Sequence, residues 1–382
     1  RIQAVIERGI PGCSTLLRMV GKYVWRAIGA ANFALLFACM FFLGNVMPFL
    51  SKYVVKPFFP SIHEQFKCQM AEIMFGTITD WSEVVGGLKV IVTGDKIPEG
   101  SAVLISNHVS FTDSIAIHCI ARRHAELGHV RPFAKSSLAY VPIFGWFGVF
   151  INYIFLSRSW DLDKMKIRKQ LQELTMKARL YASGNFWLML FPEGTRLRPK
   201  KLAEAQEFAK KRDMPVLENL LVPRTKGWVS SLDGTRDAVA GIIDVTIGYS
   251  AWTKSGHARP SVGDCMFSLG GEWPVHVHVR YFPIKTVPEG QEEEGKWLQD
   301  RWTDKDKLLE AFKRDGHFPG EARPLRKRTV LEAFLNYAAM VLIALTTRAA
   351  LVFLAQHAYR QDWAEVARQA HQGIEALLLA AK

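Results

Sequence analysis

The chain has 382 residues, 49% of them hydrophobic, and its 49 lysines and arginines outnumber 36 aspartates and glutamates to give a formal net charge of +13. This length allows one large domain with appended segments or two domains. The five cysteines are scattered without a Cys-x-x-Cys pair, which argues against a disulfide framework or a zinc knuckle and indicates a reducing compartment. A basic chain without RNA-binding or zinc-finger spacing points to anionic lipid headgroups as partners and away from nucleic acid.

An uncharged segment covers residues 27–51 and is long enough to cross ~30 Å of hydrocarbon as a helix. Pro48 interrupts it, so a hairpin that bends there is an alternative to a span, and a buried core helix is a second alternative. Lysines and arginines flank the segment on both sides, which suits an anchor at an anionic membrane face. We therefore expect residues 1–82 to form N-terminal membrane-anchoring helices.

Strands and helices alternate through the middle of the chain, which predicts an α/β fold with a mostly parallel central sheet flanked by helices. The expected strands are 87–95, 102–106, 130–135, 148–156, 185–191, 220–223, 241–248 and 275–281, and the expected helices are 58–81, 114–128, 161–183 and 291–314. We expect this α/β domain to cover residues 83–325. An apolar helical segment follows within residues 326–382, with uncharged residues 333–347 that either span a membrane or lie in its interface.

The first strand end that carries chemistry is the run from Asn107 to Ser114, directly after the apolar residues 102–106. An imidazole at this edge of an open sheet can accept a hydroxyl proton near neutral pH, and a carboxylate can orient it, so His108 and Asp113 are the candidate catalytic pair. The alternative is that His108 only satisfies backbone in the turn and that Asp113 caps the following helix.

Three further apolar runs end in basic residues and are expected at the same edge. The first ends at Arg158, the second continues into Glu193, Gly194, Thr195 and Arg196, and the third continues into Pro223, Arg224 and Lys226. Glycine lets a backbone approach a ligand closely, and arginine offers a planar fork of donors to phosphate. A base surrounded by cations predicts a site for a phosphorylated substrate. The alternative for each motif is a tight turn with surface ion pairs.

These motifs in this order resemble those of the glycerolipid acyltransferases, the family of lysophosphatidate and lysophospholipid acyltransferases, and most of all its lysocardiolipin acyltransferase-like eukaryotic branch. The resemblance extends from the N-terminal apolar segment to about residue 320. It implies that His108 is the general base, that Asp113 orients it, and that Arg158 helps to hold the phosphorylated acceptor. It also assigns glycerol phosphate binding to the motif with Glu193, Gly194, Thr195 and Arg196, and acyl-chain or acyl-CoA placement to Pro223, with Arg224 and Lys226 as anion contacts.

The resemblance implies an enzyme that moves a fatty acyl chain from acyl-CoA, as co-substrate, to the free hydroxyl of a lysophospholipid, without a metal or another cofactor. Val109 and Ser114 depart from the family pattern and line the acceptor entrance, so the resemblance does not identify the headgroup of the acceptor. His276 and His278 lie on one face of a strand, but no third metal ligand is evident.

The expected location is a membrane of the endoplasmic reticulum or the mitochondrion, as an integral or monotopic protein. The chemistry does not require the apolar extension beyond residue 330, which motivates a second hypothesis. On that hypothesis, the chain is a structural, lipid-binding subunit of a larger membrane complex.

Overall fold

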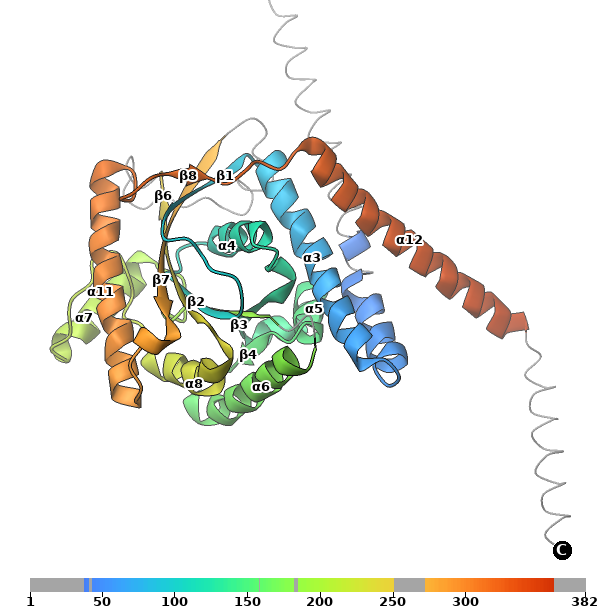
Figure 1. Ribbon diagram of the computed structural model, residues 1–382, viewed down its shortest axis with the longest axis horizontal. Helices are drawn as coiled ribbons and strands as arrows, with labels where there is room; N and C mark the ends of the chain where they lie inside the picture. Colours follow the sequence, from blue (N-terminus) through green and yellow to red (C-terminus); the bar gives the residue numbers. More distant parts are fainter. Residues whose placement is uncertain (1–37, 41–42, 158, 182–184, 251–271, 361–382) are drawn as a thin grey trace, which may run out of the picture.

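The protein is described by a computed structural model that covers residues 38–40, 43–157, 159–181, 185–250 and 272–360 (Figure 1). Within these residues eight strands form one sheet in the order β4-β3-β5-β2-β6-β7-β1-β8. The strands are β1 Leu88–Gly94, β2 Ala102–Ser106, β3 Val130–Lys135, β4 Ile154–Leu156, β5 Trp187–Leu190, β6 Gly241–Tyr249, β7 Trp273–Pro283 and β8 Arg323–Pro324. Strands β4, β3, β5, β2 and β6 are parallel to one another, whereas β7 is antiparallel to β6. The predicted mostly parallel sheet is confirmed.

Helices cover both faces of this sheet. The α-helices are α3 Pro60–Val84, α4 Thr112–Arg123, α5 Phe144–Phe150, α6 Trp160–Leu180, α7 Pro199–Lys211, α8 Thr225–Thr235, α11 Gln291–Asp315 and α12 Val330–Arg360. The short helical segments are η1 Ser51–Val55, η2 Leu127–His129, η3 Ser136–Tyr140, η4 Arg236–Ala238 and η5 Ile284–Thr286. In Figure 1, α11 and α7 lie on one side of the sheet and α3 and α4 on the other. Every residue of β2, β5 and β6 is buried as a result, which explains the apolar runs of β2 and β5.

The prediction of a strand over residues 148–156 is largely wrong. The strand β4 begins only at Ile154, and the aromatic run before it forms helix α5. Ile143, Phe147 and Ile151 are buried at a spacing of four, which is the period of a helix face and not of a strand.

The strand predicted over residues 220–223 is also wrong, because this segment is a loop. Leu220, Leu221 and Pro223 are buried, and an apolar run of this length also predicts a buried strand. The backbone N–H groups just before it donate to the Asp306 carboxylate, and the Arg224 N–H donates to the Pro192 carbonyl oxygen. The backbone hydrogen bonds on either side of this segment therefore go to a side chain and to a turn, and the segment is not paired with a strand of the sheet.

The apolar terminal segments pack on the same side of the domain. The helix Ala38–Val55 is the one described helix long and apolar enough to cross a membrane, and α12 contains a shorter apolar stretch, Val330–Thr346. A second apolar cluster, separate from the main core, joins side chains of both helices to α3 and α5. Residues 27–37 and 41–42 of the predicted apolar segment 27–51 lie outside the described residues, as does the C-terminal tail from residue 361.

Candidate active site

The turn that follows β2 is fixed by hydrogen bonds on both sides of His108. The Asn107 side chain donates to the Ile247 carbonyl at 3.0 Å and accepts from the Ile247 N–H at 2.8 Å, so it extends the pairing of β2 with β6 by one residue. The His108 N–H donates to Glu193 Oε1 at 3.2 Å, and the His108 carbonyl accepts from the Leu197 N–H at 2.7 Å. The His108 backbone is therefore held in place by β6 and by the turn after β5.

The side chains of His108 and Asp113 form the predicted pair. His108 Nδ1 lies 2.9 Å from Asp113 Oδ2, and the imidazole stacks on Phe191 with a distance of 4.1 Å between ring centroids. The Asp113 carboxylate is fully buried, whereas the imidazole is 19% exposed. Because Nδ1–H donates to the carboxylate, Nε2 is left as the proton acceptor of the ring.

Asp113 also holds the turn before α4, but it does not cap that helix, which has no side-chain cap hydrogen bond. Its Oδ2 accepts the N–H groups of Val109 at 2.6 Å and Ser110 at 2.8 Å, and its Oδ1 accepts the hydroxyl of Tyr249. Four donors on one buried carboxylate fix its position. Sequence reasoning missed Tyr249. The available signal was its place as a polar aromatic residue directly after the predicted strand 241–248.

Glu193 lies beneath the pair as a buried carboxyl group. Burial raises its pKa well above the ordinary value of 4.5, the Asp113 carboxylate acts in the same direction, and the His108 N–H opposes the shift. The protonated form of Glu193 is therefore favoured relative to that of an exposed glutamate. A neutral acid can accept the His108 N–H bond without placing a second negative charge beside Asp113.

Replacing Glu193 with glutamine is expected to leave folding and activity nearly unchanged, because the amide oxygen keeps the bond to His108. Since the pKa is raised in the folded state, wild type loses stability relative to Glu193→Gln as the pH rises from 4.5. The melting-temperature difference between the two proteins should therefore grow with pH. The variant Glu193→Ala should lose roughly 1–3 kcal/mol, because the buried His108 N–H is left without its acceptor. A pH-independent difference would show that folding does not raise the pKa of Glu193.

The turn after β5 brings together Arg196 and Arg224, which with Lys226 form the cationic rim of the site. Gly194 adopts a φ of +69°, and a Cβ added there would lie 2.9 Å from Nε of Arg224. The Arg224 N–H donates to the Pro192 carbonyl at 2.8 Å, so the two motifs meet although the second follows a loop and not a strand. Arg196 and Arg224 are exposed, and neither forms an ion pair within the described part of the chain. Both guanidinium groups are available to an anion.

The variant Gly194→Ala is expected to raise KM for a phosphorylated acceptor more than it lowers kcat, because the added methyl group displaces Arg224. The left-handed backbone adds roughly 1–2 kcal/mol of strain, which thermal unfolding would report. Gly227→Ala is the matched control, since nothing lies within 4 Å of a Cβ at that helical position. Equal kinetic effects of the two substitutions would contradict the role assigned to the Gly194 turn.

Residues 89–247 match the family model described as Acyltransferase, and residues 269–340 match the one described as Acyltransferase C-terminus. The probable 1-acyl-sn-glycerol-3-phosphate acyltransferase 5 of Arabidopsis thaliana is 33% identical over 278 residues, which are 72% of this chain and 70% of that protein. This chain belongs to the glycerolipid acyltransferase family. The prediction of a glycerolipid O-acyltransferase is thereby confirmed, whereas the lysocardiolipin-like branch stays a prediction.

Two further similarities are more distant. The 1-acyl-sn-glycerol-3-phosphate acyltransferase gamma of Homo sapiens is 31% identical over 251 residues, which are 65% of this chain and 64% of that protein. The crystal structure of the 1-acyl-sn-glycerophosphate acyltransferase PlsC from Thermotoga maritima covers 74% of this chain and 98% of that chain, with a TM-score of 0.41 and 17% identity.

The fold of this acyltransferase brings most of the predicted site residues to one edge of the sheet. His108 and Asp113 lie beside Glu193, and the turn with Gly194, Thr195 and Arg196 meets Arg224. The two other predicted site residues beside Arg224 differ in exposure. Pro223 is buried, and Lys226 is exposed with its Nζ 5.7 Å from the ring centroid of Trp160. Arg158 lies outside the described residues.

A buried ionic network supports the site from the α11 side of the sheet. Asp244 of β6 is fully buried and pairs with Lys305 of α11, and its Oδ2 accepts Nη2 of Arg280 at 2.6 Å. Burial lowers the pKa of Lys305 to about 8, although the Asp244 carboxylate opposes the shift. Because β6 also holds Asn107 and Tyr249, this network fixes the strand that positions the catalytic turn.

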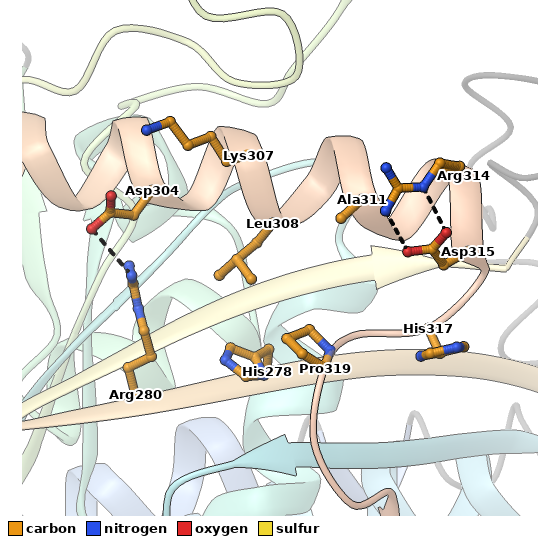
Figure 2. A pocket seen from close by; sticks show the side chains of 10 residues that line it. All are labelled: His278, Arg280, Asp304, Lys307, Leu308, Ala311, Arg314, Asp315, His317 and Pro319. Carbon is orange, nitrogen blue, oxygen red and sulfur yellow. Dashed lines mark hydrogen bonds and ion pairs between the residues drawn. The ribbon is translucent and has the colours of Figure 1, made fainter.

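A separate pocket of about 540 Å³ lies between β7 and the C-terminal half of α11 (Figure 2). Its charged groups are largely paired with one another, since Arg280 contacts Asp304 and Arg314 contacts Asp315. His278, which also lines it, is hydrogen-bonded to Thr93 at 2.9 Å. His108 is not among the lining residues, so this pocket is separate from the catalytic pair.

The histidine pair on β7 has structural partners. His276 Nε2 lies 3.1 Å from the Ser250 hydroxyl, and the His278 ring lies 5.7 Å from that of Phe318. Across the part of the chain that the structure describes, no group of three or more histidines, cysteines or carboxylates could hold a metal ion. The two histidines therefore act as packing and hydrogen-bonding residues there.

Proposed function

We propose that this acyltransferase moves a fatty acyl group from acyl-CoA to the free hydroxyl of a lysophospholipid, with lysophosphatidate as the acceptor. The observation that carries the proposal is the 2.9 Å contact between His108 Nδ1 and the buried Asp113 carboxylate, at an edge of the sheet rimmed by unpaired arginines. The names of the relatives, which are 1-acyl-sn-glycerol-3-phosphate acyltransferases, support lysophosphatidate over other headgroups.

In the proposed reaction, His108 Nε2 accepts the proton of the acceptor hydroxyl as its oxygen attacks the thioester carbonyl carbon. The new C–O bond forms, the C–S bond breaks, and coenzyme A leaves as a thiolate that takes up the proton from the imidazolium. Asp113 stabilises the imidazolium and holds the ring with Nε2 facing the substrate. Acyl-CoA acts as co-substrate, and the proposal requires no other cofactor.

The rim supplies the recognition of the acceptor phosphate. Arg196 and Arg224 are exposed, lie on adjoining turns and can donate in a forked geometry to phosphate oxygens. Lys226 adds a cation in the first turn of α8. An acceptor without a phosphate group would leave these donors unused, so we expect lysophosphatidate to react faster than monoacylglycerol.

The acceptor is a lipid, and the apolar helix Ala38–Val55 would hold the enzyme in the membrane that contains it. We propose an integral or monotopic attachment to the endoplasmic reticulum or the mitochondrial membrane. Fluorescence microscopy of the tagged full chain against markers of both organelles tests this location.

The function is tested with the purified full chain in phospholipid vesicles. Acyl-CoA is offered with lysophosphatidate, lysocardiolipin, lysophosphatidylcholine or monoacylglycerol, and both free thiol and acylated product are measured. We expect the highest kcat/KM with lysophosphatidate. Higher kcat/KM with lysocardiolipin would instead place the chain in the lysocardiolipin-like branch. Failure to acylate any of these acceptors, together with stable co-purification in a complex, would favour the hypothesis of a structural lipid-binding subunit.

A further inference from the structure

We propose that the exposed apolar face of η3 and α5 inserts into the interfacial layer of an anionic phospholipid bilayer, as a second membrane contact beside the apolar terminal helices. We call this face the α5 patch. It consists of Leu138, Tyr140, Val141, Phe144, Trp146 and Val149.

The α5 patch is unusual for a surface that faces water. Its six side chains are between 41% and 82% exposed and occur within twelve consecutive residues. The opposite face of α5 is fully used, since Phe147 is buried and packs against Phe75 of α3 at 5.9 Å between ring centroids. The outward residues therefore contribute nothing to the core. An exposed apolar cluster of this kind marks a surface that binds a protein or a membrane.

The α5 patch adjoins the apolar terminal helices. The Ile143 N–H of the turn before α5 donates to the side chain of Asn45, which lies in the helix Ala38–Val55. The second apolar cluster joins Leu43 of this helix, Phe147 of α5 and Met340 of α12. Figure 1 shows α5 on the side of the molecule that carries α3 and α12, whereas α7 lies on the opposite side. A bilayer that holds the helix Ala38–Val55 is thus placed beside α5.

The charges around the α5 patch identify the occupant as an anionic lipid surface. Between Glu126 and Asp161 the chain contains no acidic residue, and Lys135, directly before η3, is exposed. The segment before α3 is similar, with cations and no carboxylate between residues 8 and 63. Tryptophan and tyrosine favour the interfacial layer of a bilayer, and each nearby cation adds attraction to anionic headgroups.

The position of the α5 patch serves a lipid substrate. Segment η3 begins directly after β3, and β3, β5 and β2 are parallel, so η3 starts at the edge of the sheet that carries Glu193 and His108. Docking of this face would bring the catalytic edge to the headgroup layer. A lysophospholipid could then reach His108 without leaving the bilayer.

The test uses the full chain reconstituted into vesicles of phosphatidylcholine and phosphatidylglycerol, with brominated phosphatidylcholine as the fluorescence quencher. The emission of Trp146 is the difference between wild type and Trp146→Phe, which keeps an aromatic side chain. The matched control adds a tryptophan on α7, as Trp146→Phe/Phe208→Trp, because Phe208 is comparably exposed but lies on the opposite side of the molecule.

We expect the Trp146 component to be blue-shifted and strongly quenched, and the component added at position 208 to be quenched little. Omitting phosphatidylglycerol should weaken the quenching, and equal quenching without it would overturn the anionic part of the proposal. An unquenched Trp146 component, in proteins with unchanged circular dichroism, would overturn the whole proposal and indicate that protein or water covers the α5 patch. The variant His108→Ala should show the same quenching as wild type, so this outcome is separate from that of the proposed reaction.

Discussion

The variant His108→Ala is expected to lower kcat for acyl transfer by about 10²–10⁴-fold, the usual contribution of a positioned general base. The loss should fall on kcat and not on KM, because the imidazole acts on the proton and the arginines of the rim hold the phosphate. The melting temperature should change little, since the His108 backbone makes the bonds that fix the turn and the side chain is partly exposed. Release of coenzyme A under saturating substrates measures the effect.

His124→Ala provides the matched control, because His124 is exposed at the C-terminal end of α4, away from the catalytic turn. Asp113→Asn should lower both kcat and the melting temperature, since Asp113 holds the backbone of Val109 and Ser110 as well as the imidazole. Unchanged kcat in His108→Ala would refute the proposed base, whatever the behaviour of Asp113→Asn.

The variant Asp244→Ala is expected to destabilise the protein by ~3–5 kcal/mol, because it leaves the fully buried Lys305 without its pairing carboxylate. Activity should fall as well, since β6 positions both Asn107 and Tyr249. Thermal unfolding of the purified chain, followed by circular dichroism, measures the loss of stability.

The comparison for this second prediction is Asp304→Ala, which removes the partly exposed partner of Arg280 and should cost only ~0–1 kcal/mol. The double variant Asp244→Ala/Lys305→Met removes both buried charges and should recover part of the lost stability. Equal melting temperatures of Asp244→Ala and Asp304→Ala would show that the buried network does not stabilise the sheet.

The sheet was predictable from sequence where burial on both faces leaves an uninterrupted apolar run. Residues 102–106 are a strand with the predicted bounds for this reason, and residues 130–135 also form a strand with the predicted bounds. Helix α5 and the loop at residues 220–223 were not predictable in this way, because a short apolar run reads alike in a strand, a helix or a buried loop. Their conformations depend on partners distant in the chain, such as Phe75 for α5 and Pro192 for the loop.

The sequence predicted which strand ends carry the site residues, but it did not predict the hydrogen bonds and ion pairs that hold them. The position of His108 after an apolar run, with Asp113 five residues later, was sufficient to propose the pair. Tyr249 reaches Asp113 from 136 residues away in sequence, and Lys305 pairs with Asp244 on the strand that supports the site. Neither residue belongs to a local pattern. Such contacts are set by the pairing of β2 with β6 and by the packing of α11.

The two hydrogen bonds between the Asn107 side chain and the Ile247 backbone bear on side reactions of the enzyme. Together with the bonds to Glu193, Leu197 and Asp113, they hold the catalytic turn in its working geometry through protein contacts alone. On the proposed mechanism, Nε2 of His108 is therefore as ready to accept a proton from water as from a lipid hydroxyl. Avoiding hydrolysis of acyl-CoA then depends on keeping water away from this nitrogen once the thioester is bound.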